Sequence, residues 1–272
     1  MMKNRQNKTK QIFGFLLGAL VLFSFKVDKE YKSVPFEPVN NRAFVEGEKL
    51  KYRLHYGFID AGEAIIEIKK EDRLFAGRST FHAVGTGYSK GAFDWFFKVR
   101  DRYETYIDRQ AIVPMAFFRR VDEGGYKINQ NQVFNHYKNE VISNGEIFKV
   151  PTGVQDMLSA FYYARTINFD KAAIGEVFTI TSFVDNEIFP LKIRFAGREV
   201  IKTDVGKIRC LKFRPVIQKG RVFKDEEDLA VWISDDNNHI PLRAEAEILV
   251  GSIKMDIISC EGLAGPLALV KK

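Results

Sequence analysis

The chain has 272 residues, of which 46% are hydrophobic, and a formal net charge of +7. Five basic residues and no acidic residue lie within residues 1–26, so the remainder carries 37 basic and 35 acidic residues, a net charge of +2. Nucleic-acid binding requires a basic patch or stripe, whereas here Lys and Arg alternate with Asp and Glu, so no nucleic-acid partner is expected.

Residues 1–25 have the pattern of an export signal. Lys3 to Lys10 form a basic segment, and an uncharged apolar run of 14 residues follows from Ile12 to Phe25. A run of this length is too short for a comfortable membrane span but suits the core of a signal peptide. We therefore expect a periplasmic protein that contacts the membrane only through this segment. Retention of residues 12–25 as an uncleaved anchor is the alternative.

The segment after the export signal predicts a short linker and then one β-rich domain. Residues 26–45 are polar and contain prolines, as expected of a linker. From Glu46 onward apolar and charged residues alternate, as in KLKYRLHY, and such alternation is typical of a half-buried strand. About a dozen such segments with short turns predict antiparallel hairpins over residues 46–262. Residues 263–272 are expected to form a C-terminal tail.

One segment, PTGVQDMLSAFYYARTI, has helical rather than alternating periodicity. Thr152 and Gln155 have the spacing of a capping box, which predicts a helix over about residues 153–167. The expected fold is mainly β: a strongly curved antiparallel sheet or open β-barrel of about a dozen strands, with this helix packed inside it.

Aromatic residues are concentrated next to a glycine-rich connection. Four of them lie within residues 93–97, and the chain contains 24 phenylalanines. A concave sheet lined by such side chains, with a mobile lip, would bind an apolar ligand. The expected lining residues are Trp95, Phe96, Phe97, Phe161 and Tyr162. The alternative is that these rings fill a solid core, as side chains do in small barrels.

The segment Gly87 to Gly91 matches the hydrolase motif G-x-S-x-G, with Ser89 at the nucleophile position. His136 or His239 would have to act as the base. The motif needs a strand-to-helix turn in an alternating α/β sheet, whereas period-two strands surround it here. A glycine-rich connection is therefore favoured, and no catalytic residue is assigned.

Five polar residues, Asp235 to His239, interrupt the apolar segments of VWISDDNNHIPLR. An EF-hand loop needs glycine at its sixth position, where the two available registers place Ile240 or Pro241. Asp and Asn are favoured in turns, so a hairpin turn is predicted, without a metal or another cofactor. Cys210 and Cys260 could form one disulfide in an oxidising compartment, but two unpaired thiols are favoured.

Five segments, in chain order, resemble the bacterial exported family known as domain-of-unknown-function family 3108. They are GEKLKYRLHYGFIDAGEAIIEI, VRDRYETYID, QDMLSAFYYAR, GREVIKTDVGKIRCLKFRP and VWISDDNNHIPLRAEAEILVGSIKMDI. The resemblance extends over roughly residues 46–262 and implies export without an established activity. The W-x-S-x-D turn followed by P-x-R is also similar, at the level of the fold, to periplasmic lipoprotein carriers of the LolA/LolB type. That similarity implies an open barrel around a helix, with an apolar cavity and no assigned site residues.

The expected function is that of an exported cell-envelope protein, not an enzyme, that binds an apolar small molecule or lipid. One alternative is a structural module that binds another envelope protein, which an exposed edge strand or apolar surface patch would favour. The other alternative is a serine hydrolase at Ser89.

Overall fold

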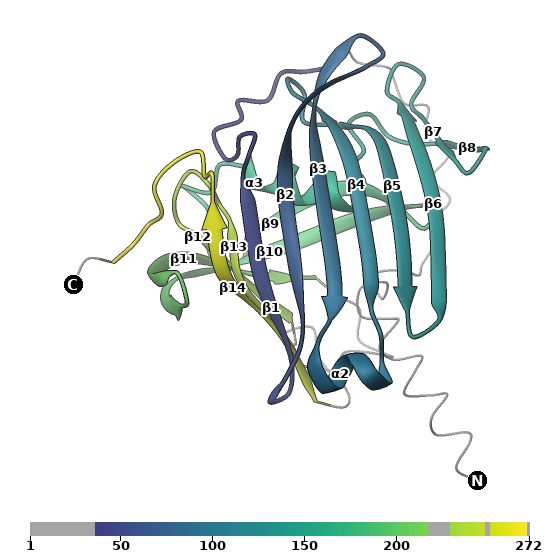
Figure 1. Ribbon diagram of the computed structural model, residues 1–272. Coiled ribbons are helices and arrows are strands. Elements are labelled where there is room, and N and C mark those ends of the chain that lie inside the picture. The colour runs from purple at the N-terminus through teal and green to yellow at the C-terminus, as the bar shows by residue number, and fades with distance from the viewer. Residues whose placement is uncertain (1–35, 217–228, 248–250, 271–272) are drawn as a thin grey trace.

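The computed structural model describes residues 36–216, 229–247 and 251–270, so the predicted export signal lies outside the described residues (Figure 1). The described residues contain fourteen strands and two helices. In chain order these are β1 (Lys49–Tyr56), β2 (Ile59–Phe75), β3 (Arg78–Ser89), α2 (Gly91–Phe96), β4 (Arg100–Asp108), β5 (Pro114–Glu123), β6 (Tyr126–Asn135), β7 (Glu140–Ser143), β8 (Glu146–Lys149), α3 (Met157–Arg165), β9 (Val177–Val184), β10 (Glu187–Thr203), β11 (Gly206–Pro215), β12 (Leu229–Ser234), β13 (Pro241–Glu247) and β14 (Ser252–Glu261).

All fourteen strands form one antiparallel sheet in the order β8-β7-β6-β5-β4-β3-β2-β1-β14-β13-β12-β11-β10-β9. Strands that follow one another in the chain pair with one another, except for β8 and β9, which lie at the two ends of the sheet. The pairing of β1 with β14 joins the first half, β1–β8, to the second half, β9–β14. The predicted antiparallel, mainly β fold is therefore confirmed.

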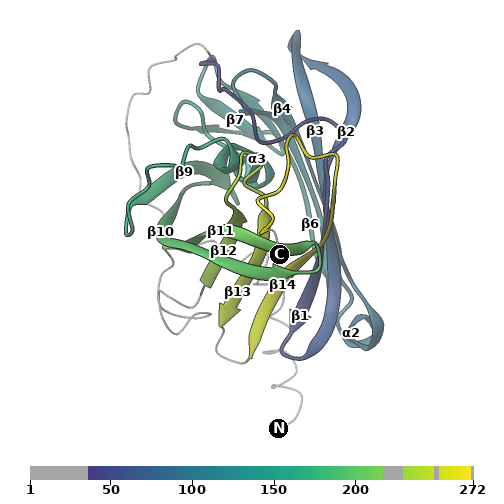
Figure 2. The same cartoon turned by 90° about the vertical axis from the view of Figure 1, so that its left-hand side faces the viewer.

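The sheet curls so that its second half faces the inner surface of the first (Figure 2). The β9–β10 turn reaches β5, where Arg119 Nη1 donates a hydrogen bond to Asp185 Oδ1 at 2.6 Å. The ring centroids of Phe148 in β8 and Phe183 in β9 are 5.4 Å apart. These contacts place the two ends of the sheet close together without pairing β8 to β9, so the barrel is open.

Helix α3 lies inside this curve, as predicted, but it begins later than the sequence indicated. Its N-cap is Asp156, whose Oδ1 accepts hydrogen bonds from the amides of Leu158 and Ser159 at 2.7 and 2.8 Å. The prediction that Thr152 caps the helix was wrong because the intervening residues pair with β9: the amide of Gln155 donates to Thr181 O. Pairing with a strand distant in sequence thus overrides the local capping signal.

A second helix, α2, forms where the sequence predicted only a glycine-rich connection. Gly91 adopts a φ of +54°, which favours glycine and lets the chain turn away from β3. Phe93 and Phe97 lie one helical turn apart and are both buried against Ala61 of β2. Burial of these two rings stabilises a helix of six residues that would be marginal alone.

The interior is packed around α3. The larger core cluster joins α3 to the inner face of the first half, and a second cluster joins β1 to β10–β14. The largest members of the first cluster are Phe44, Phe81, Phe117, Phe134, Tyr162 and Phe183. The second cluster includes Leu50, Tyr52, Ile208, Trp232, Leu242 and Ile257. The alternative of the sequence analysis, in which the rings fill a solid core, therefore describes the rings of these two clusters.

Both segments that flank the strands contribute to the domain. Within the expected linker, Phe44 is 1% exposed, and the amide of Val39 donates to Gln110 O at 2.7 Å. Within the expected tail, Ala268 is buried, and its carbonyl accepts from the amide of Arg209. The folded unit thus extends on both sides beyond residues 46–262.

Cys210 and Cys260 are both free thiols, as the sequence analysis favoured. Cys210 is fully buried in β11, whereas Cys260 in β14 is half-buried. Burial raises the pKa of the Cys210 thiol to about 12, so it is protonated at neutral pH and is a poor nucleophile.

Candidate functional site

Two of the five predicted lining residues, Phe161 and Tyr162, lie on α3 inside the curved sheet. Tyr162 is fully buried, with its ring centroid 4.8 Å from that of Phe44 and 5.1 Å from that of Phe161. Phe161 is half-buried and packs against both core clusters. Tyr162 is therefore part of the packed core in this structure.

The C-terminal end of α3 carries a fully buried ion pair. Arg165 donates to both carboxylate oxygens of Glu48, at 2.6 and 2.7 Å. Arg165 also donates to the carbonyls of Ala43 and Asn238, both at 2.9 Å. These bonds tie α3 to the segment before β1 and to the β12–β13 turn. Because the guanidinium group donates to four acceptors within the protein, we assign the cluster a structural role in holding these segments together.

The β12–β13 turn is the segment Asp235 to His239, and its prediction as a hairpin turn is confirmed. Asp236 Oδ1 accepts from the Asn238 amide at 2.9 Å, while its Oδ2 accepts from the amide of Ala268 at 2.7 Å. A ring nitrogen of His239, Nδ1, is 2.8 Å from Arg165 O. The polar side chains of this turn therefore bind the backbone of the C-terminal segment and of α3. Across the described part of the chain, no three His, Cys, Asp or Glu side chains converge as a metal site would require.

Ser89 lies at the end of β3, immediately before α2. Its hydroxyl donates to Asp94 Oδ1 and accepts from the amide of Val99 at 2.8 Å. Hydrogen bonds from Arg100 and Ser89 lower the pKa of the Asp94 carboxyl to about 2. His136 and His239 instead face the carbonyls of Pro114 and Arg165, at 2.7 and 2.8 Å. Ser89 thus links the end of β3 to α2 and to the segment before β4, and the two candidate bases hydrogen-bond to backbone carbonyls elsewhere.

The other aromatic residues near α2 are separated into a buried and an exposed set. Phe97 is buried in a small cluster with Phe93 and Ala61. Trp95 lies on the opposite side of α2 and is 92% exposed, while Phe96, whose ring centroid is 4.8 Å from that of Phe93, is 59% exposed. Phe93 and Phe97 are one turn apart and share the inner face of the helix, so Trp95, halfway between them, faces outward.

A second turn places two more apolar side chains at the same end of the sheet. The β1–β2 turn contains Phe58, whose side chain is fully exposed, and Ile59, the first residue of β2, is 50% exposed. Figure 1 shows this turn and α2 at the lower end of the first half, and the rings of Tyr56 and Phe93 link them at 6.4 Å. We call Phe58, Ile59, Trp95 and Phe96 the aromatic tip.

The five residues predicted to line one aromatic cavity therefore lie at three separate places in the structure. Trp95 and Phe96 lie on the outer surface, Phe97 lies beneath α2, and Phe161 and Tyr162 lie around α3. The helical conformation of residues 91–96 is the reason, because it turns two of the consecutive rings away from the sheet. Phe58 and Ile59 were not predicted, although two large apolar residues beside Gly57 in a hairpin turn are a recognisable signal.

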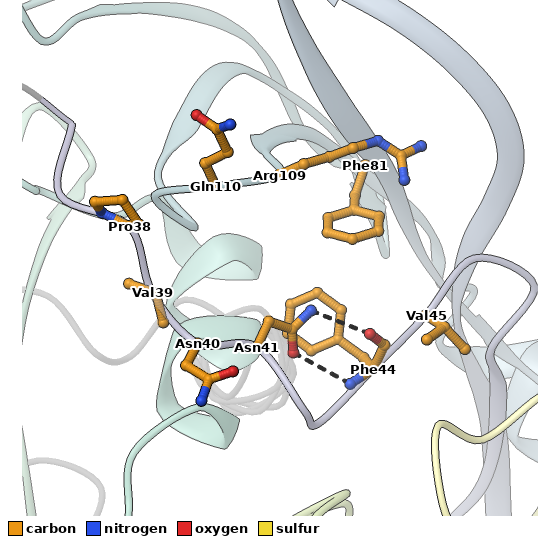
Figure 3. A pocket seen from close by; sticks show the side chains of 9 residues that line it. All are labelled: Pro38, Val39, Asn40, Asn41, Phe44, Val45, Phe81, Arg109 and Gln110. Carbon is orange, nitrogen blue, oxygen red and sulfur yellow. Dashed lines mark hydrogen bonds between the residues drawn. The ribbon is translucent and has the colours of Figure 1, made fainter.

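A surface depression of about 530 Å³ lies at the opposite end of the first half, beneath residues 38–45 (Figure 3). The rings of Phe44 and Phe81 form its floor, with centroids 5.4 Å apart. Asn41 Nδ2 donates to Phe44 O at 3.1 Å, and the Arg109 guanidinium lies 4.5 Å from the Phe81 ring centroid. None of the five predicted lining residues contributes to this depression. Its lining combines apolar side chains with Asn41, Arg109 and Gln110, so it differs from the expected aromatic cavity.

A family model matches residues 51–258, about three quarters of the chain. The family is described as "Protein of unknown function (DUF3108)". No curated protein matches the chain significantly. None of the helices in the described ranges is long and apolar enough to cross a membrane.

Solved structures resemble this chain at the level of the fold. A β-barrel-like protein of the domain-of-unknown-function family 1849 from Brucella abortus has a TM-score of 0.51 and 7% sequence identity. The similarity covers 81% of this chain and 99% of that one. A hypothetical protein from Chlamydia trachomatis has a TM-score of 0.38 and 8% identity, over 85% of this chain and 94% of that one. The second similarity is too low to support an inference.

Proposed function

We propose that this chain, which belongs to the DUF3108 family, is a cell-envelope protein that binds lipid membranes through its aromatic tip. The observation that carries the proposal is the exposure of Phe58, Ile59, Trp95 and Phe96 on the β1–β2 hairpin and the neighbouring helix α2, at one end of the sheet. The basic segment and apolar run of residues 1–25 support export to the periplasm.

The shape of the tip favours a bilayer over a protein partner. Protein partners usually bind large apolar residues in packed pockets, whereas Phe58 and Trp95 project fully into solvent from a hairpin turn and a short helix. Aromatic side chains, and Trp especially, favour the membrane–water interface because the ring is apolar and its edge is polar. Burial of each large ring would contribute about 1.5–3 kcal/mol, so several of them could hold the domain at a bilayer reversibly.

The charges near the tip are largely paired. Arg100 forms an ion pair with Asp94 at 2.7 Å, and Glu63 accepts charged contacts from Lys90 and from Lys51, the latter at 2.9 Å. Attraction to anionic lipids would therefore contribute little, and the apolar contact would dominate. We expect binding to zwitterionic vesicles that salt weakens only slightly, because salt screens charge attraction but not apolar burial.

Tryptophan fluorescence tests this proposal in the full chain. Trp95 and Trp232 are its two tryptophans, and Trp232 is buried in the second core cluster. Phosphatidylcholine vesicles should shift Trp95 emission to the blue, and brominated lipid should quench it. Trp95→Phe should remove this response, and replacing Phe58 and Phe96 with serine should weaken vesicle partitioning by more than tenfold.

The control must separate docking at the tip from tethering through the N-terminus. Leu74 is exposed near the end of β2, next to the β2–β3 turn and far along that strand from Ile59 in the tip. A tryptophan introduced by Leu74→Trp in the Trp95→Phe background should not be quenched. Equal quenching at both positions, or no quenching of Trp95, would contradict docking through the tip.

A further inference from the structure

Positive charge is concentrated on strands β10 and β11. Residues 187–215, which form these two strands and the turn between them, contain eight Lys or Arg and three Asp or Glu, a net charge of +5. Residues 27–272 together carry a net charge of only +2, so the rest of that range is negative, at −3. The excess positive charge of the domain therefore lies on one hairpin.

Three of these cations share one exposed face of the hairpin, next to its turn. Lys202 lies directly opposite Lys207, and Val200 lies directly opposite Arg209. Opposite residues, and residues two positions apart on a strand, point to the same side of a sheet. All four residues are exposed, Val200 to 45%, whereas the residue between the two members on each strand is buried. We call Val200, Lys202, Lys207 and Arg209 the cationic face.

Within the part of the chain that the structure describes, the three cationic side chains of this face form no ion pair or hydrogen bond. The acidic residues nearest to them in the chain contact other cations. Glu199 Oε1 lies 3.5 Å from Lys212 Nζ, and Asp204 Oδ2 lies 3.2 Å from Arg53 Nη1. The positive charge of the cationic face is therefore available to another molecule.

The direct opposition of Lys202 and Lys207 is unfavourable in the free chain. The Cβ atoms of directly opposite residues are about 4.5–5.5 Å apart, and like charges at such positions destabilise the strand pair. Salt screens this repulsion without turning it into an attraction. An anionic partner would neutralise both ammonium groups, so its binding would be favoured by relief of the repulsion as well as by direct attraction.

The spacing of the cations matches carboxylates along an extended chain. Alternate residues of a strand are about 6.6–6.8 Å apart, so Lys207 and Arg209 have the repeat of acidic residues at alternate positions of an extended peptide. Val200 adds an apolar contact of the kind that protein interfaces contain. A single phosphate group is instead held by donors that surround it in a concavity, whereas these side chains stand side by side on two strands. We propose that the cationic face binds an extended segment of another protein in which acidic residues alternate with uncharged ones.

Fluorescence anisotropy with the full chain, in the absence of lipid, tests the proposal separately from docking of the aromatic tip. The probe is a fluorescein-labelled peptide with four Glu-Thr repeats. Its affinity should fall as salt is added, because salt screens attraction between exposed charges. A peptide of four glutamates followed by four threonines has the same composition and should bind at least about threefold more weakly, because its carboxylates do not match the strand repeat. Inorganic phosphate and a duplex DNA of twelve base pairs should compete less well than the alternating peptide.

Charge-reversed variants test the location. Lys202→Glu combined with Lys207→Glu should weaken binding of the alternating peptide by at least about tenfold. Lys70→Glu combined with Lys138→Glu changes the net charge equally at two exposed lysines of the first half, and this variant should bind as the parent chain does. Lys207→Glu alone should raise the melting temperature, because it places opposite charges across the hairpin.

Four results would overturn the proposal. They are equal weakening of peptide binding by the two double variants, a melting temperature lowered by Lys207→Glu, equal binding of the two peptides, and tighter binding of DNA or phosphate than of the alternating peptide. Loss of vesicle binding with peptide binding intact would contradict the aromatic tip alone.

Discussion

Replacement of Arg165 by methionine should strongly destabilise the fold, because it leaves the Glu48 carboxylate buried without its counter-charge. The side chains of Arg165 and Glu48 are 2% and 0% exposed, so water cannot replace the lost contacts. Methionine retains helix propensity and much of the side-chain volume. The loss of stability would therefore come from the charge and its hydrogen bonds.

The expected magnitude follows from the four hydrogen bonds of the guanidinium group. Removal of one partner of a buried ion pair costs about 3–5 kcal/mol. At roughly 2–4 °C per kcal/mol for a domain of this size, the melting temperature should fall by about 6–20 °C. Two of the four bonds go to the carbonyls of Ala43 and Asn238, and their loss accounts for about 1 kcal/mol each. Loss of the carboxylate contacts accounts for the rest.

Urea unfolding, followed by the emission of the buried Trp232, measures this loss. The double variant with Glu48→Met removes both charges, so it should be more stable than Arg165→Met alone by about 2–3 kcal/mol. Lys149→Met breaks an ion pair with Glu140 in which the lysine side chain is 73% exposed, and it should cost under about 1 kcal/mol. If Arg165→Met cost no more than Lys149→Met, or the double variant were no more stable than the single one, the reasoning would be refuted.

Three further predictions concern the cap of α3, the buried acid and the thiols. Asp156→Ala should lower the free energy of unfolding by about 1–2 kcal/mol in the same urea assay, because Asp156 caps the helix. Thr152→Ala should lower it clearly less. Equal losses of stability in the two variants would contradict the assignment of Asp156 as the cap. Burial, together with the neighbouring Asp101 carboxyl, raises the pKa of Glu123, so the native state retains a proton that the unfolded chain releases. Stability should therefore fall as the pH rises from about 4.5 to 8. Glu123→Gln should make the free energy of unfolding less dependent on pH over this range. A variant with the same pH profile as the parent chain would refute the role of Glu123. In the native protein, Cys210 should resist a thiol reagent that modifies Cys260, and it should react fully after unfolding in urea. A disulfide detected by mass spectrometry would contradict the presence of two free thiols.

The class of the fold could be predicted from the sequence because side-chain alternation is a local property. In KLKYRLHY, Leu50 and Tyr52 alternate with charged residues, and the structure buries both against β14. The alternation fixes which face of a strand is apolar, whatever its neighbours are. The pairing of β1 with β14, which joins the two halves of the sheet, depends on residues some two hundred positions apart and leaves no local pattern.

The boundaries of the helices were less predictable because other elements compete for the same residues. Thr152 and Gln155 satisfy the local capping pattern, but Gln155 forms backbone hydrogen bonds with β9 instead. Conversely, α2 has no strong local signal and depends on burial of Phe93 and Phe97 against β2. In both places tertiary contacts outweigh the weak helix propensity of a few residues.

The candidate sites show the same division. The sequence by itself determined that aromatic residues concentrate at 93–97, that Asp235 to His239 form a turn, and that the domain is rich in β-strands. Only the tertiary structure decided that Trp95 and Phe96 face outward beside Phe58, and that Asp101 and Glu123 meet on the inner face of the sheet. Composition and period are properties of neighbouring residues, whereas exposure and the meeting of side chains depend on how the sheet curls. The curl is fixed by long-range strand pairing, so the aromatic tip and the contact of Asp101 with Glu123 follow only from the tertiary structure.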